Sequence, residues 1–288
     1  MPFRVFKNQR GQMRRRFTRV FCLLAMPVLL MEQAFAATPV PLHVVYEISL
    51  TGIPIGVASL DGTLNGRRYD LVLTSRFTGL VGLVMGLKID AKSQGTASDT
   101  QIIPSRYDLT VASSGNKRTV LMKLTTGDVT TLEVDPPLPE RPDRVPVLPE
   151  HKKGIVDPLG GLLFPLSDAA MGKPLNCERS IPVFDGAARF DINLTPDHEE
   201  TLKIIGYDGP VAVCSVRYVP VAGHRPKRGT TAFMETNRDI EVKLAPYSGS
   251  QFAVPLEIAV PTLVGKIRLS AVRIGPEPVQ SAQSTTGD

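Results

Sequence analysis

Apolar and polar residues alternate in short runs along most of this 288-residue chain. In the clearest run, residues 67–77, Tyr69, Leu71 and Leu73 share one face of a predicted strand. Asn65-Gly66, just before it, is a strong signal for a two-residue hairpin turn. Short runs separated by turns at regular spacing are typical of antiparallel sheet, not of alternating strands and helices. The first half is predicted to form strands at 42–50, 55–64, 67–77, 88–98, 106–113, 117–124 and 129–134.

The second half continues the same pattern around two cysteines. Asp185-Gly186 predicts a hairpin between the first two strands that follow Cys177, and Cys214 falls within the fourth. We therefore expect an antiparallel meander in this region, followed by further sheet. The predicted strands are 180–184, 187–194, 200–207, 211–219, 230–244, 252–260 and 264–274.

The segment 78–87 is apolar without polar alternation. Leu80, Val84 and Leu87 would share one face of a helix, although three glycines weaken helix formation there. We interpret the segment as a short helix or loop that lies against a concave sheet. It would either fill the core or act as a lid that faces a lipid or a partner.

A second helix is predicted over residues 157–171. Asp157 is a suitable N-cap, and Pro158 occupies the first helical position, where a missing N–H costs nothing. Leu162 and Leu163 contribute to its apolar face. Because an apolar helix beside a twisted sheet needs a surface to cover, we expect it over the open side of the sheet.

A proline-rich segment separates the two halves. Residues 135–149 contain six prolines, which favour extended geometry and cannot donate to a strand ladder. We interpret residues 135–156 as a semi-rigid crossing between two sheet halves, with partner recognition as the alternative. The predicted fold is mainly β: an antiparallel open β-barrel, β-spiral or half-barrel, with one or two short helices covering the concave face and a single domain over residues 37–275.

The ends of the chain differ in composition from this domain. Residues 1–36 combine a basic stretch, an apolar run at 20–30 and the small-residue site Ala34-Phe35-Ala36, as a signal peptide does. We expect cleavage after about Ala36, with no stable membrane anchor afterwards; either general secretion or twin-arginine export would serve. Residues 276–288 lack apolar periodicity and are predicted to be a disordered tail.

Removal of this leader changes both the charge balance and the number of cysteines in the chain. Its removal takes away seven of the 33 basic residues and one of the 28 acidic ones, leaving 26 against 27. The balance gives no electrostatic case for binding nucleic acid. Cys22 is lost too, so Cys177 and Cys214 remain, an even number in an exported protein. A disulfide is favoured over two buried thiols, and the predicted compartment is the periplasm.

The sequence offers little that could carry catalysis. The histidines, His43, His151, His198 and His224, are isolated from one another, and no nucleophile or phosphate-loop motif is present. We therefore predict no enzyme activity, no metal and no cofactor. The most site-like cluster surrounds Tyr218, His224 and Arg225, where a basic loop could bind a carboxylate or phosphate, or could simply be a solvated surface loop.

Several short segments carry a resemblance to a known family: 52–56 (G-I-P-I-G), 103–107 (I-P-S-R-Y), 157–159 (D-P-L), 183–186 (V-F-D-G) and 218–225 (Y-V-P-V-A-G-H-R). Residues 43–274 resemble an uncharacterised family of proteobacterial periplasmic proteins, known only as a domain of unknown function. The expected architecture is also similar to the open, helix-plugged β-barrels of periplasmic lipoprotein carriers, at the level of the fold alone.

These observations favour an exported, non-enzymatic protein of cell-envelope maintenance that binds an apolar, lipid-like ligand or a periplasmic protein on its concave face. A purely structural or protein-interaction scaffold is the main alternative, and an enzyme of envelope glycan or lipid the other. The residues expected to face the ligand or partner are Leu80, Val84, Leu87, Leu162, Leu163, Tyr218, His224 and Arg225.

Overall fold

Antiparallel pairing joins almost every strand to its neighbours in one continuous sheet. The computed structural model describes residues 38–79, 82, 86–167 and 174–275, so the expected leader and tail lie outside it. The first seven strands are β1 (Val40–Leu50), β2 (Ile53–Asn65), β3 (Arg68–Phe77), β4 (Lys88–Ala97), β5 (Ile102–Ser113), β6 (Asn116–Thr125) and β7 (Asp128–Asp135). The others are β8 (Phe164–Pro165), β9 (Arg179–Phe184), β10 (Arg189–Ile204), β11 (Tyr207–Ala222), β12 (Ile240–Pro246), β13 (Phe252–Thr262) and β14 (Gly265–Ile274).

The first and last long strands, β1 and β14, pair with each other in the middle of the sheet. The two edge strands, β7 and β9, therefore come from the middle of the chain. The strand order is β7-β6-β5-β4-β3-β2-β1-β14-β13-β12-β11-β10-β9, and β8 pairs separately with β13. The proline-rich crossing therefore starts beyond one edge strand, β7, and leads toward the other, β9. The chain between them includes the 3-10 turns η1 (Pro149–Lys152) and η2 (Gly160–Leu162).

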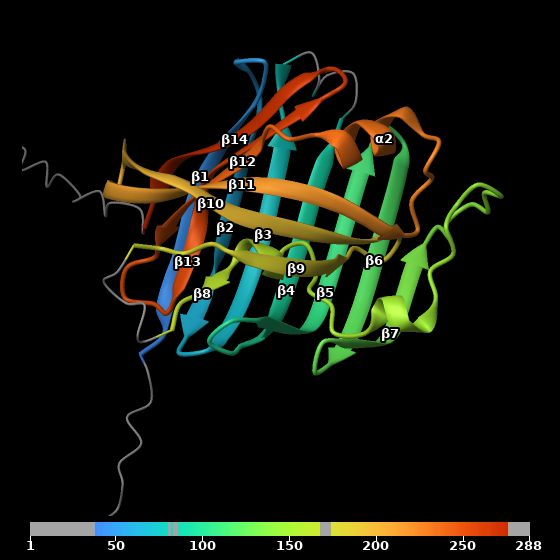
Figure 1. The fold of residues 1–288 in the computed structure, drawn as a ribbon, viewed down its shortest axis with the longest axis horizontal. Helices are drawn as coiled ribbons and strands as arrows, with labels where there is room; N and C mark the ends of the chain where they lie inside the picture. The colour runs from blue at the N-terminus through green and yellow to red at the C-terminus, as the bar shows by residue number, and fades with distance from the viewer. Residues whose placement is uncertain (1–37, 80–81, 83–85, 168–173, 276–288) are drawn as a thin grey trace, which may run out of the picture. The chain divides into compact units, whose positions relative to one another are not determined.

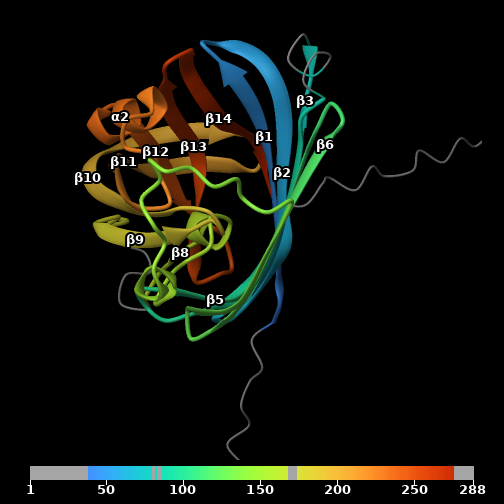
Figure 2. The same ribbon diagram turned by 90° about the vertical axis from the view of Figure 1, so that its right-hand side faces the viewer.

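The sheet curls so that its two halves face each other. Strands β9–β11 cross in front of β2–β6 at a steep angle (Figure 1). In the turned view, β1–β6 form a curved wall, and β9–β13 lie on its concave side (Figure 2). Residues after η1 bridge the remaining gap: Ile155 N–H donates to Gly127 O beyond β6, and Val156 exchanges backbone bonds with β9. This arrangement confirms the prediction of an antiparallel, open, barrel-like β fold.

Alternation along β3 shows how the sequence selects the concave face. Tyr69 and Leu71 are buried while Arg68 and Asp70 are exposed, as the pattern predicted. The turn before β3 has Gly66 at a φ of 55°, a conformation that few other residues tolerate, which confirms the Asn65-Gly66 hairpin. Inward residues of β1–β6 form one core with the inner side of β13, including Phe252, Val254 and Leu256.

The helix predicted over residues 157–171 is wrong in the part that the structure describes. The Asp157 carboxylate caps only the 3-10 turn η2, where the pair Gly160-Gly161 disfavours a longer helix. Leu163 is already extended, and Phe164–Pro165 pairs with β13 as β8. Thus η2 contacts β4 and β5 on the concave face, but as a single turn. Residues 168–171 lie outside the described part.

Two predicted strand boundaries are also wrong. Residues 230–244 were predicted as one strand, but the helix α2 (Gly229–Thr236) precedes the shorter strand β12 and lies against β11 and β13. The strands predicted at 187–194 and 200–207 are one strand, β10, which tolerates Pro196 because a bulge interrupts the pairing there.

The segment 78–87 is described only in part. Gly82 N–H donates to Thr78 O at 3.1 Å and Gly86 N–H donates to Gly82 O at 2.9 Å, which is helical spacing. Leu87 is half-buried. Leu80 and Val84, two of the predicted ligand-facing residues, lie outside the described residues.

The disulfide predicted between Cys177 and Cys214 is present. It joins the chain just before β9 to β11, and both residues are fully buried. Its sulfurs belong to a second core, which also includes Leu194, Val216, Val242 and Leu244. The bridge therefore fixes the start of β9 against the strands of the second half.

Candidate functional site

An apolar cavity lies among the strands of the second half. Its volume is about 200 Å³, and each of five successive strands contributes apolar side chains to its wall. Representative lining residues are Ile181 of β9, Leu194 of β10, Val216 of β11, Val242 of β12 and Ile258 of β13. An apolar cavity of about 150 Å³ can stay dry and bind benzene, so this one has room for a hydrocarbon group.

The wall is continuous because pairing places inward residues side by side. Leu194 pairs with Val216 and Ile192 with Tyr218 across β10 and β11, so all four side chains share one face of the sheet. The Tyr218 ring also packs on Phe190, with ring centroids 5.1 Å apart. These contacts give the cavity an aliphatic wall with an aromatic border.

Two short elements border the cavity. η2 contributes Gly161 and Leu162, and α2 contributes Met234. Asn237, just after α2, donates from its side-chain amide to the Pro261 carbonyl at 3.0 Å, which ties the end of the helix to β13. Met is unbranched and polarizable, and it adapts to irregular neighbours. Met234 is therefore suited to border a cavity both with and without a ligand in it.

The η2 turn is held in place by a fully buried carboxylate, Asp157. Its Oδ1 accepts from the backbone N–H groups of Leu159 at 3.0 Å and Gly160 at 2.8 Å, while the Ser93 hydroxyl of β4 donates to Oδ2 at 2.7 Å. Burial raises the pKa of Asp157 to about 6, against the opposing effect of these hydrogen bonds. The carboxylate thus attaches η2, and with it Leu162, to the first half of the sheet.

Gly160 is required at this attachment. A Cβ there would lie 2.9 Å from Asp157 Oδ2 and 3.0 Å from the Tyr69 hydroxyl oxygen. That hydroxyl is buried, and desolvation raises the pKa of Tyr69 far above its ordinary value. A perturbed buried carboxylate beside a tyrosine is a pattern found at catalytic sites, but also in structural networks. Because Asp157 already caps η2 and its neighbours fill the core, we assign it a structural role.

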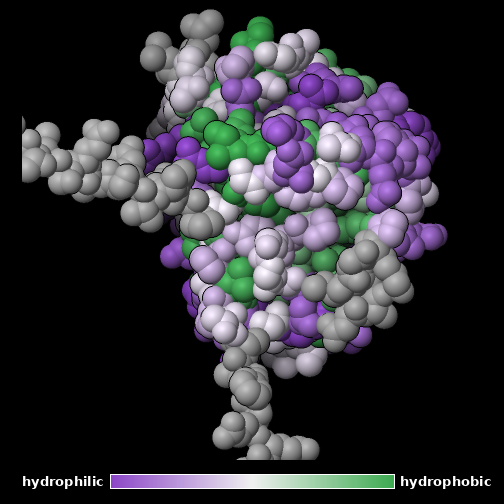
Figure 3. Space-filling model, turned by 90° about the vertical axis from the view of Figure 1, so that its left-hand side faces the viewer, coloured by the Kyte–Doolittle hydropathy of each residue, from purple (hydrophilic) through white to green (hydrophobic). Residues whose placement is uncertain are grey.

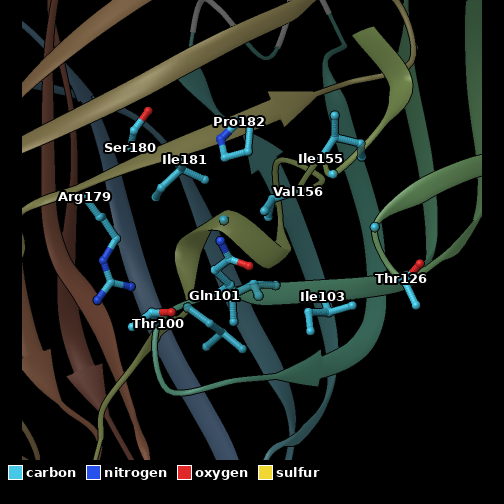
Figure 4. Close-up of a pocket in the computed structure, with 15 residues that line it drawn as sticks. Thr100, Gln101, Ile103, Thr126, Ile155, Val156, Arg179, Ser180, Ile181 and Pro182 are labelled. Atoms are coloured by element: carbon cyan, nitrogen blue, oxygen red, sulfur yellow. The ribbon is translucent and has the colours of Figure 1, made fainter. Parts of the chain in front are cut away.

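A smaller, more polar cavity adjoins the apolar one. Its volume is about 80 Å³, and Gly161 and Ile181 line both cavities. Figure 4 shows Arg179 extending from β9 toward Thr100 and Gln101, which precede β5, with Val156 and Ile181 nearby. A cationic side chain therefore lines the small cavity that adjoins the apolar one.

The described residues among those predicted to face a ligand lie at the apolar cavity, at the smaller cavity or at neither. Leu162 and Tyr218 both line the apolar cavity, so the structure brings them together. Leu163 is buried in the first core and lines the smaller cavity instead. Leu87, half-buried, lies at neither cavity.

His224 and Arg225 lie away from both cavities, where they anchor the proline-rich crossing. Arg225 Nε donates to both carboxylate oxygens of Asp143 at 2.9 and 2.8 Å, and Val145 N–H donates to the His224 carbonyl at 2.9 Å. The hydrogen bond from Arg225 lowers the pKa of Asp143. The basic loop thus contacts its own chain instead of forming a pocket with Tyr218.

Sequence reasoning missed Met234 and Arg179. Met234 was missed because Thr230, Thr231 and Phe233 are residue types that favour strands. The turn-like sequence Asn237-Arg238-Asp239 was the one signal that the predicted strand 230–244 is interrupted. Arg179 follows the cysteine by two residues and gave no signal of its own.

Other parts of the described surface offer little further chemistry. No three side chains of the metal-binding types gather within the part of the chain that the structure describes. Across those same residues, no helix has the length and apolar character needed to cross a membrane. Hydrophobic residues gather near the centre of one face among hydrophilic ones (Figure 3). Exposed apolar residues such as Ile53 and Val264 are ordinary features of protein surfaces.

Comparison with known proteins identifies a family but no activity. Residues 45–272 match the family described as "Protein of unknown function (DUF3108)". No curated protein matches the chain. A solved structure from Brucella abortus, described as a beta-barrel-like protein of domain of unknown function DUF1849, is similar at 11% identity with a TM-score of 0.48. That match covers 82% of this chain and 97% of the other.

Proposed function

Since this chain belongs to the DUF3108 family, whose function is unknown, we propose its function from its own geometry: it binds an apolar, lipid-like ligand and catalyses no reaction. The observation that carries the proposal is the apolar cavity among β9–β13. Pockets built for ligands are mostly apolar and partly preformed, and this one has aliphatic side chains on five strands around it. Its volume suits a segment of hydrocarbon chain and not a whole lipid.

The location of the cavity narrows the expected binding surface, which was the concave face of the sheet as a whole. The inward residues of β1–β6 are packed against β13 and η2; Leu60 and Leu71 are fully buried. The space for a ligand lies instead inside the second half. We therefore propose a ligand site bordered by Leu162, Tyr218 and Met234.

We place this activity in the periplasm, in cell-envelope maintenance. The disulfide supports the proposal, because such bonds persist in oxidising compartments and are rare in the cytosol. The leader-like composition of residues 1–36 supports it independently. A pure scaffold role for the basic loop is less favoured, since Arg225 already bonds to Asp143 within the chain.

The test is to fill the cavity and measure binding of a small apolar probe. Isothermal titration of the purified protein with 1-octanol is compared with the same titration of Val242→Phe, whose added ring occupies the cavity. The matched control, Val57→Phe, makes the same change at a residue that is 49% exposed on β2. We expect Val242→Phe to weaken octanol binding at least about tenfold, or 1.4 kcal/mol, and the control to leave it unchanged.

Stability provides the second measurement in this experiment. Because a ring placed in an empty space gains contacts, Val242→Phe should keep or raise the melting temperature. Loss of binding with retained stability supports a ligand cavity. Octanol binding that persists in Val242→Phe, or that is absent from the wild-type protein, contradicts the proposal.

A further inference from the structure

Arg179 is a half-buried cation that has no acidic partner among the residues that the structure describes. Its Nε is buried without a hydrogen-bond partner, and none of the ion pairs among the described residues includes it. Burial lowers its pKa. Burying a charge is costly unless an opposite charge or hydrogen bonds compensate for it. The free protein therefore leaves part of the guanidinium unsatisfied at this position.

A cation–π contact places Arg179 beside a residue that lines the apolar cavity. Its guanidinium carbon lies 4.9 Å from the centre of the Phe164 ring, a cation–π arrangement. Phe164 itself lines the apolar cavity. The positive charge therefore lies in contact with a side chain that borders the hydrocarbon-binding space.

The small cavity beside Arg179 has the character of a head-group site. The other polar side chains along it, including Thr100, Gln101 and Thr126, are neutral, and no carboxylate of the described residues lines it. Arg179 also borders a larger hollow that includes Asp99 and Glu199, whose carboxylates would repel an anion. Of the two spaces next to the guanidinium, the small one is the better suited to an anionic group, and it shares Gly161 and Ile181 with the apolar cavity.

We propose that Arg179 binds the anionic head group of an amphiphile whose hydrocarbon chain occupies the apolar cavity. This rests on the proposed function and narrows its ligand class from apolar molecules in general to acidic amphiphiles. The planar guanidinium matches the geometry of both carboxylate and phosphate oxygens, so either head group satisfies the chemistry.

The experiment compares three linear probes that each contain eight carbon atoms. The purified wild-type protein is titrated with 1-octanol, octanoate and octyl phosphate, and the titrations are repeated with Arg179→Met. This variant keeps an unbranched side chain over Phe164 and removes the charge. Arg118→Met, at an exposed position of β6, is the matched control for a change in net charge.

We expect the wild-type protein to bind at least one anionic probe about tenfold more tightly than octanol, and Arg179→Met to lose that preference while binding octanol as before. Arg118→Met should behave as wild type. Tighter binding of octanoate than of octyl phosphate identifies a carboxylate ligand, and the reverse order identifies a phosphate.

Failure of this inference is distinguishable from failure of the proposed function. Octanol binding without any preference for an anionic probe in the wild-type protein overturns the role of Arg179 and leaves the apolar site standing. A preference that survives in Arg179→Met overturns the assignment to this residue. A wild-type protein that binds none of the three probes overturns the proposed function itself.

Discussion

The two halves of the sheet differ in how completely they fill their interiors. The concave side of β1–β6 packs against β13 and η2, and Leu60, Leu71 and Met122 are fully buried there. The inner side of β9–β13 borders a partly open space of about 200 Å³ lined by equally apolar residues. Composition alone therefore does not decide which region can accept a ligand. What decides it is whether another part of the chain fills the space.

Removing the disulfide of the second half is expected to have the largest effect on stability. A bridge across a loop of this length, with a sequence separation of 37, stabilises the fold by about 4 kcal/mol in the chain-entropy model. We expect the double variant Cys177→Ala/Cys214→Ala to lose roughly that amount in urea unfolding. Because the bridge fixes β9 against β11, octanol binding should weaken too. Unchanged stability would mean that the bridge does not constrain the second half.

Asp157, which attaches η2 to the packed half, predicts a pH dependence. Its pKa is raised from 3.8 to about 6 in the folded protein. Between these values the folded protein holds a proton that the unfolded chain has released, so the contribution of Asp157 to stability is lost as pH rises from about 4 to 6. The full effect is roughly 3 kcal/mol.

The matched variant for this effect is Asp157→Asn, which keeps an oxygen that can accept from Leu159 and Gly160 but cannot ionise. Urea unfolding of both proteins is measured from pH 4 to pH 7. Relative to wild type, the variant should gain about 3 kcal/mol across this range. Parallel profiles for the two proteins would show that burial does not raise the pKa of Asp157.

Truncating one leucine in each half compares their packing directly. Leu60→Ala removes a side chain from the filled core, and Leu194→Ala removes one that borders the cavity. Core truncations cost about 2–5 kcal/mol, and a residue with fewer neighbours loses fewer contacts. We expect Leu60→Ala to cost about 2 kcal/mol more than Leu194→Ala in free energy of unfolding. Equal costs would indicate that the second half is packed as tightly as the first.

The strands and the disulfide could be predicted from the sequence because their signals are local. Period-two burial in β3, the Asn65-Gly66 turn and the two cysteines each depend on neighbouring residues or on residue count. The prediction of a helix over 157–171 was wrong because the Asp157 carboxylate caps only one turn. Beyond that turn, Phe164 pairs with β13 as part of a strand. Local cap chemistry does not reveal how far a helix continues.

The candidate site could be predicted only in fragments. Leu162 and Tyr218 were identified as apolar or aromatic residues near the right elements, and both line the cavity. His224 and Arg225 were grouped with Tyr218 by sequence proximity, but Tyr218 is directed to the inner side of β11 while Arg225 reaches Asp143 of the crossing. Which face a residue takes, and which distant segment it meets, depends on the curl of the whole sheet.

Two methionines allow the most direct test of the central claim, that the interior of the second half contains a ligand-accessible apolar space and that of the first does not. Met234 lines the cavity, whereas Met122 is fully buried in the filled core. With ¹³C-labelled methionine methyl groups, NMR titration with 1-octanol reports on both residues in one sample. We predict a saturable shift of the Met234 methyl resonance and none for Met122. An unmoved Met234 resonance, or equal shifts of both, would contradict the account.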